Sequence, residues 1–184
     1  MEMMMRVKSY ESFKILFLSI LLIFFFGCGE GSKARDSSIG KAPGNNPMEK
    51  GRLILPDFSL QDMEGREHRL ADYIGEKPVL LVFWTTGCRF CIQEIPRLNK
   101  IFLDRADDLK LLSINILESK RVITRLMQAK GIQYPILMDP HGVTVRDYHI
   151  RGVPTVVVID LNGNMGYYGH DLSEAMNKIE GLLS

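Results

Sequence analysis

The stretch WTTGCRFC, residues 84–91, constrains the fold more than any other part of this 184-residue chain. Its cysteines, Cys88 and Cys91, follow an apolar run from Lys77 to Trp84, which predicts a strand that is covered on both faces. After the cysteines, apolar residues recur at helical spacing, and Pro96 is expected to kink this helix near its start. The cysteine pair is therefore expected where a buried strand ends and a helix begins.

The rest of the chain alternates between strand and helix patterns and predicts an α/β domain with a central mixed sheet. The predicted elements are a hairpin turning at Glu64-Gly65, a strand at 109–116, a helix at 119–130, a strand at 134–138, a helix at 143–148, a hairpin turning at Asn162-Gly163, and a closing helix capped by Ser173 or Asp171. In such sheets ligand sites lie at the carboxyl ends of strands, where the cysteines are expected.

The first 27 residues have the pattern of an export signal. Basic residues precede an apolar run of about thirteen residues at 15–27, which is shorter than the roughly 20 needed to span a bilayer. Cys28 follows directly and resembles the lipidated cysteine of a bacterial lipoprotein; an ordinary cleaved signal and an uncleaved anchor are the alternatives. We therefore divide the chain into a signal peptide (1–27), a flexible tether (28–52) and a folded domain (53–184).

A lipidated Cys28 leaves only two cysteines, Cys88 and Cys91, for chemistry outside the cytoplasm, where disulfides persist. The loop that they would close is too short to stabilise a domain much, so a redox-active pair is favoured over a structural one. A zinc site needs about four ligands, and none of the four histidines is paired at such spacing, so no metal is expected. The net charge of +1 gives no reason to expect nucleic acid as a partner.

The expected position of Cys88 at a helix N-terminus favours its thiolate, because unpaired backbone N–H groups and the helix dipole both attract negative charge. Arg89 adds a positive charge beside it. Cys91 lies one helical turn further on and can attack a mixed disulfide formed at Cys88. These residues predict thiol–disulfide exchange.

A second motif, RGVPT at 151–155, stands about sixty residues after the cysteines and before a predicted strand. The combination of FW, CxxC, a following E and P, and GVPT resembles the thioredoxin superfamily. The segments DFSLQDMEG and CRFCIQEIPRL are similar to its TlpA/ResA-type branch, which overlaps the AhpC/TSA redoxin group. Over residues 53–184 the resemblance implies a thioredoxin-like fold with an N-terminal β-hairpin extension and a βα insertion. It also implies a membrane-tethered, extracytoplasmic thiol–disulfide oxidoreductase.

The resemblance assigns a role to each residue of the motifs. Cys88 would be the exposed nucleophile and Cys91 the resolving thiol. Pro154 would be a cis-proline that packs against the disulfide, so that the backbone of Val153 can pair with an extended substrate segment. Phe90 and Arg89 would offer further surface to a substrate.

Glu94 lies three residues after Cys91 and therefore on the same helical face. In this branch a glutamate at that position serves the active site, and a partly buried carboxylate can exchange a proton with Cys91. Thioredoxin proper uses an aspartate two residues before the tryptophan, where this chain has Val82. Glu94 is therefore the local candidate for that role, with an exposed helix-surface acid as the alternative.

The chain departs from the family pattern beside the cysteines. Gly87 stands where tryptophan is usual, and the spacer is Arg89-Phe90 instead of x-Pro, so the reduction potential and partner choice are expected to differ. The expected partners are protein thiols or disulfides and a membrane thiol donor. The expected direction is reduction, for example of apocytochrome c, by a monomer without a cofactor.

Three other functions stay open at this stage. A peroxidase is suggested by Thr85, three residues before the first cysteine, but Leu81 replaces the proline expected four residues before that threonine. A copper-binding assembly factor is the second alternative; such proteins usually have CxxxC and a distal histidine, whereas this chain has CxxC. A lipoprotein adaptor with a vestigial site would retain the fold without the activity.

Overall fold

The structure is a computed structural model that describes residues 55–184, which belong to the second of two compact units, Asn45–Ser184. The predicted signal peptide, the proposed lipidation site at Cys28, the tether at 28–52 and the first two residues of the predicted domain lie outside the described residues. Among residues 55–184, no helix is both long and apolar enough to cross a membrane.

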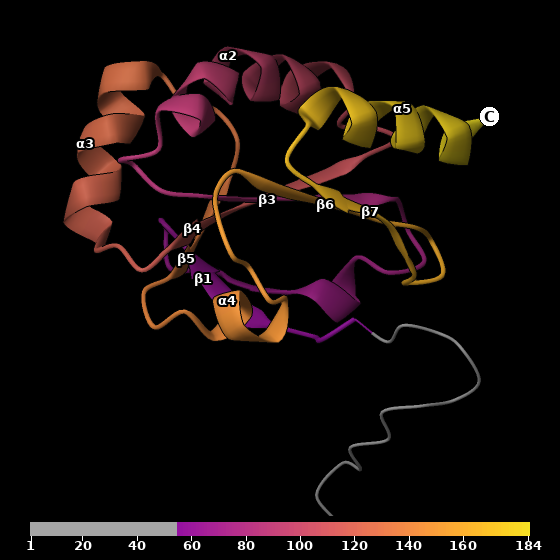
Figure 1. Cartoon of the computed structure of the whole chain (residues 1–184), viewed down its shortest axis with the longest axis horizontal. Helices are drawn as coiled ribbons and strands as arrows, with labels where there is room; N and C mark the ends of the chain where they lie inside the picture. The colour runs from indigo at the N-terminus through magenta and orange to yellow at the C-terminus, as the bar shows by residue number, and fades with distance from the viewer. Residues whose placement is uncertain (1–54) are drawn as a thin grey trace, which may run out of the picture. The chain divides into compact units, whose positions relative to one another are not determined.

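A seven-stranded mixed sheet forms the centre of the domain, as the sequence predicted, with the strand order β2-β1-β5-β4-β3-β6-β7 (Figure 1). The strands are β1 (Ser59–Asp62), β2 (Glu67–Arg69), β3 (Val79–Trp84), β4 (Lys110–Ile116), β5 (Ile136–Asp139), β6 (Thr155–Ile159) and β7 (Met165–Gly169). The neighbours β3, β4 and β5 run parallel, whereas β1, β6 and β7 pair with their neighbours in antiparallel fashion. The N-terminal hairpin β1–β2 extends the sheet beyond β5.

Helices cover both faces of this sheet. They are the 3₁₀ helix η1 (Leu70–Asp72) and the α-helices α2 (Arg89–Asp104), α3 (Lys120–Lys130), α4 (Val143–Asp147) and α5 (Leu172–Leu183). In Figure 1, α2 and α5 lie over one face and α4 lies over the other. The segment between β4 and β6 forms α3, β5 and α4, and it contains the βα unit that the resemblance implied.

The central strand β3 is buried at every position, which confirms the prediction of a strand covered on both faces. Leu80, Val82 and Trp84 pack with α2 and α5 in one core cluster, and the three alternate residues pack in a second cluster on the opposite face. This double burial fixes the end of β3, and with it the position of the cysteines that follow.

The predicted elements differ from the observed ones mainly at their ends. The strand expected from Tyr134 begins at Ile136, after Pro135, because proline has no backbone N–H for a sheet ladder. The helix α2 continues through Pro96 as one element of 16 residues. Of the two candidate caps of the last helix, Asp171 is confirmed: its carboxylate accepts hydrogen bonds from the backbone N–H groups of Ser173 and Glu174.

Candidate redox site

The two cysteines lie at the carboxyl end of β3, as the sequence predicted, and they form a disulfide with their Cα atoms 5.2 Å apart. Cys91 is 5% exposed and belongs to the core between the sheet and α2. Cys88 is partly exposed and precedes the helix. A reaction partner therefore reaches Cys88 first.

Cys88 is the N-cap residue of α2, and its Sγ accepts a hydrogen bond of 3.1 Å from the backbone N–H of Cys91. In the reduced protein the same position would place a thiolate at the positive end of a 16-residue helix. Cys88 therefore has the position at a helix N-terminus on which its predicted reactivity depends.

The peptide bond between Val153 and Pro154 is cis, as the resemblance implied. The carbonyl oxygen of Val153 lies 3.5 Å from the Sγ of Cys88, although 65 residues separate them in the sequence. The loop before β6 therefore contacts the disulfide and presents its backbone beside the partly exposed Cys88.

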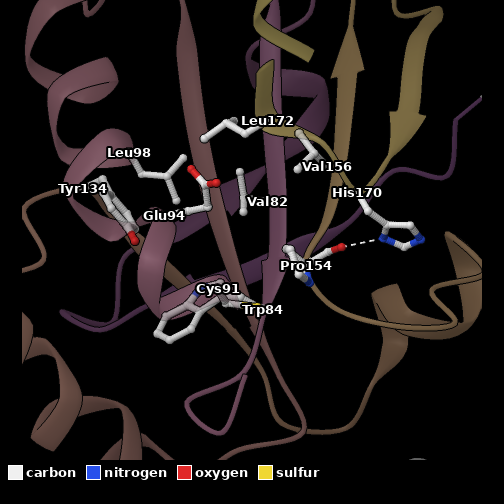
Figure 2. Close-up of a pocket in the computed structure, with 10 residues that line it drawn as sticks. All are labelled: Val82, Trp84, Cys91, Glu94, Leu98, Tyr134, Pro154, Val156, His170 and Leu172. Carbon is white, nitrogen blue, oxygen red and sulfur yellow. Dashed lines mark hydrogen bonds between the residues drawn. The ribbon is translucent and has the colours of Figure 1, made fainter. Parts of the chain in front are cut away.

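A narrow, mostly apolar pocket lies behind the disulfide between α2, β3 and β6 (Figure 2). Ten residues line it: Val82, Trp84, Cys91, Glu94, Leu98, Tyr134, Pro154, Val156, His170 and Leu172. Trp84 is 3% exposed and its Nε1–H donates to the hydroxyl of Ser113, so Trp84 is a core residue. Burial raises the pKa of the Tyr134 phenol, so this wall of the pocket stays neutral.

Glu94 is the one carboxylate among the residues that line this pocket, and it shares the lining with Cys91. Its side chain is 38% exposed, and one carboxylate oxygen lies 4.0 Å from the guanidinium of Arg97. The carboxylate is thus partly exposed on the wall of the pocket that also contains Cys91, and a partly buried carboxylate can exchange a proton with a thiol.

Arg89 and Phe90 form the first turn of α2 and are exposed. Phe90 is 63% exposed, and the guanidinium of Arg89 lies 5.4 Å from the centre of its ring. A Cβ atom added to Gly87 would meet no atom within 4 Å, so packing does not require glycine there. The exposed side chains beside Cys88 are therefore those of Arg89 and Phe90, whereas Gly87 contributes none.

The sequence analysis missed Glu118, which anchors the loop between β3 and the cysteines. Its carboxylate accepts hydrogen bonds from the backbone N–H and the hydroxyl of Thr86, at 2.7 and 2.6 Å, and from the amide of Asn115, at 2.8 Å. The sequence did contain one indication of this role. Glu118 comes just after a buried strand that runs parallel to β3, and the carboxyl ends of parallel strands lie together, so Glu118 could be expected near the cysteines. His170, whose ring contacts the carbonyl of Pro154, was also missed.

No group of three or more histidine, cysteine, aspartate or glutamate side chains within residues 55–184 is arranged to hold a metal ion. The site consists of a disulfide, a cis-proline loop and one carboxylate around a narrow pocket. A mixed sheet that carries a CxxC pair at the start of a helix and a cis-proline before the facing strand defines the thioredoxin-like class.

Comparisons with known proteins agree with this class. Residues 53–168 match the family model described as the AhpC/TSA family, and the chain belongs to this family. Thiol-disulfide oxidoreductase ResA of Geobacillus thermodenitrificans is 37% identical over 111 residues, which cover 60% of this chain and 63% of that protein. The thioredoxin-like protein YneN of Bacillus subtilis is 34% identical over 111 residues, covering 59% of this chain and 64% of that protein. These matches thus span less than two thirds of the relatives' length.

Solved structures show the same thioredoxin-like fold. A putative thiol:disulfide interchange protein DsbE from Chlorobium tepidum has a TM-score of 0.64 and 26% identity, covering 71% of this chain and 96% of that one. The pneumococcal exposed lipoprotein thioredoxin from Streptococcus pneumoniae has a TM-score of 0.60 and 27% identity, covering 70% of this chain and 98% of that one. Together with the relatives, these structures support the TlpA/ResA-type branch that the resemblance indicated.

Proposed function

We propose that this protein is an extracytoplasmic thiol–disulfide oxidoreductase that exchanges disulfides with protein substrates through Cys88 and Cys91. The observation that carries the proposal is the contact of 3.5 Å between the sulfur of the partly exposed Cys88 and the carbonyl oxygen of Val153, next to a cis-proline. An extended substrate segment that pairs with the Val153 backbone would bring its own sulfur to Cys88. The names of the ResA and DsbE-type relatives support the same activity.

In the reducing direction the Cys88 thiolate attacks one sulfur of a substrate disulfide. A mixed disulfide forms, and the first substrate sulfur leaves as a thiolate that takes up a proton. The Cys91 thiolate then attacks the sulfur of Cys88, forms the intramolecular disulfide and releases the second substrate thiol. Two electrons pass from the protein to the substrate, and Glu94 accepts the proton of Cys91 before this second attack. A membrane thiol donor would restore the reduced pair.

The location and the direction of the reaction are part of this proposal. The basic and apolar N-terminal segment and the cysteine at position 28 support export and a lipid anchor, and a structural relative is itself described as an exposed lipoprotein. A tether of about 24 residues would then hold the domain at the membrane, close to a membrane thiol donor. Reduction of a protein disulfide, such as one between the cysteines of apocytochrome c, is the family-level expectation for the substrate.

The experiment that tests the proposal is substrate trapping with the full-length chain. The Cys91→Ser variant removes the resolving thiol, so it should hold substrates as mixed disulfides at Cys88 that reductant releases. The matched control is the double variant Cys88→Ser/Cys91→Ser, which should hold none. If cells yield no trapped protein and the purified wild type does not reduce insulin, the proposal is wrong. Peroxide-dependent turnover at Cys88 in place of insulin reduction would indicate the peroxidase.

A further inference from the structure

The carbonyl group of Pro154 lies just before β6, beyond the last residue pair that joins β6 to β7. The strand β6 begins at Thr155 and pairs with β7 in antiparallel fashion, with Val156 opposite Gly169. Continuing this register would place residue 171 opposite Pro154. However, β7 ends at Gly169, and Asp171 already serves as the N-cap of α5. The backbone N–H of Asp171 instead donates to the hydroxyl of Tyr167 at 3.2 Å, so it does not pair with the carbonyl of Pro154.

The side chain of His170 fills that position. Its Nδ1 lies 2.6 Å from the carbonyl oxygen of Pro154, the contact drawn as a dashed line in Figure 2. Because a carbonyl oxygen can only accept, Nδ1 must carry the proton and donate it. The imidazole thus adds one hydrogen bond beyond the start of β6, near the carboxyl end of β3 where the cysteines lie.

We propose that His170 is a positioning residue that fixes the cis-proline segment for pairing with a protein substrate. This inference rests on the proposed function. The segment is held at two points: the hydroxyl of Thr155 donates to the carbonyl of Gly152 at 2.7 Å, and His170 donates to the carbonyl of Pro154. Between these points lies Val153, the residue whose backbone faces Cys88.

The surroundings of His170 connect it to the surface that a substrate would cover. An open pocket is lined by Phe90, Gln93, Glu94, Gly152, Val153, Pro154 and His170. It thus joins the exposed first turns of α2 to the cis-proline loop, with the imidazole forming part of its wall. A substrate segment that pairs with Val153 would lie in this pocket. The hydrogen bond from His170 to Pro154 therefore affects both the orientation of the cis-proline segment and the shape of the pocket.

Pairing with the Val153 backbone matters for a protein substrate but not for a small disulfide, which can reach the sulfur of Cys88 without it. The test therefore compares two second-order rate constants of the reduced full-length protein, one with insulin and one with a small aromatic disulfide. For His170→Ala we expect the ratio of the insulin constant to the small-disulfide constant to fall about five- to tenfold, the loss that one hydrogen bond accounts for.

Two further variants separate positioning from a general effect on the fold. In His170→Asn the amide nitrogen is as many bonds from the backbone as Nδ1 and retains a donor, so the ratio should return to within about twofold of wild type. His141→Ala removes an exposed histidine that the proposed machinery does not use, and its ratio should equal that of wild type.

An unchanged ratio in His170→Ala, or equal losses in the alanine and asparagine variants, would overturn the positioning role while leaving the proposed function intact. A wild-type protein that reacts with the small disulfide but not with insulin would overturn the proposed function, and this inference with it.

Discussion

At the scale of single residues, Glu94 is the side chain whose role the sequence predicted and whose position makes that role testable. It lines the apolar pocket together with Cys91, and its side chain is partly exposed to solvent. We expect Glu94→Gln to slow the step in which Cys91 resolves the mixed disulfide by at least about tenfold, because an amide cannot accept the thiol proton. Stopped-flow kinetics between about pH 5 and 9 should also show a changed pH profile.

The matched control for this prediction is Asp104→Asn at the last residue of α2, where the carboxylate pairs with Lys100 and lies far along the helix from the cysteines. It should react as wild type does. Kinetics of Glu94→Gln that coincide with those of Asp104→Asn over the whole pH range would show that Glu94 is only a surface acid.

Leu117 is a residue that the sequence did not single out. Its φ is 59°, in the left-handed region, where the β-carbon of an L-residue clashes with the backbone and costs free energy. Leu117 is also 62% exposed, so burial of its side chain offsets little of that cost. We expect Leu117→Asn to raise the free energy of unfolding by about 1 kcal/mol, because asparagine tolerates this conformation. Urea unfolding measures the gain. Leu117→Ala keeps an ordinary β-carbon and should give none; an equal gain in both variants would contradict the backbone explanation.

At the scale of elements, the hairpin β1–β2 is held by a fully buried carboxylate, Asp62. It accepts hydrogen bonds from the backbone N–H groups of Glu64 and Arg66, from the guanidinium of Arg66 at 2.7 Å, and from the imidazole of His68 at 2.9 Å. Burial alone would raise the pKa of Asp62, but the hydrogen bonds from His68 and Arg66 outweigh it and hold the pKa well below its usual value. The hairpin therefore depends on an ionised Asp62.

A lowered pKa in the folded state means that the unfolded protein binds a proton first as the pH falls. The stability that Asp62 contributes is thus fully present above about pH 4, its unfolded pKa, and is lost as the pH falls toward the folded pKa. We expect Asp62→Asn to lower the free energy of unfolding at pH 7 by about 2 kcal/mol, with a smaller difference from wild type below pH 4. Urea unfolding at pH 7, 4 and 3 measures both effects.

The control for the hairpin is Asp107→Asn, which changes an exposed aspartate outside this network and should leave the unfolding free energy nearly unchanged at each pH. A deficit of Asp62→Asn that stayed constant down to pH 3 would contradict the ionisation argument.

The elements also show how far the sequence alone could go. The buried strand β3 and the cysteines at the start of α2 could be predicted, because hydrophobic periodicity and spacing are local properties. The cis-proline was expected from the motif GVPT through a family resemblance. Glu118 and His170 could not be found this way, since they act on Thr86 and Pro154, which are 32 and 16 residues away along the chain. Such contacts depend on which strand ends meet at the sheet edge, and no local pattern encodes that.

At the scale of the whole molecule, folding and the redox state of the cysteine pair are linked, because any factor that favours one redox state in the fold changes its stability. Two features act in opposite directions. The N-terminus of α2 stabilises a Cys88 thiolate and thus the reduced form. The pocket disfavours a thiolate at Cys91 and thus the reduced form, because Cys91 is 5% exposed and the same apolar pocket is lined by the carboxylate of Glu94.

We expect the pocket to have the larger effect, so that the oxidised protein is more stable than the reduced one, as a reductant requires. A strong oxidant has the reverse order, because its reduced form is the stabilised one. Urea unfolding of the full-length protein with and without dithiothreitol measures the difference, and each 1.4 kcal/mol corresponds to about 30 mV of reduction potential relative to the unfolded pair. The Cys88→Ser/Cys91→Ser variant should not respond to the reductant. A reduced form more stable than the oxidised one would reverse the proposed direction and make this protein an oxidant of its substrates.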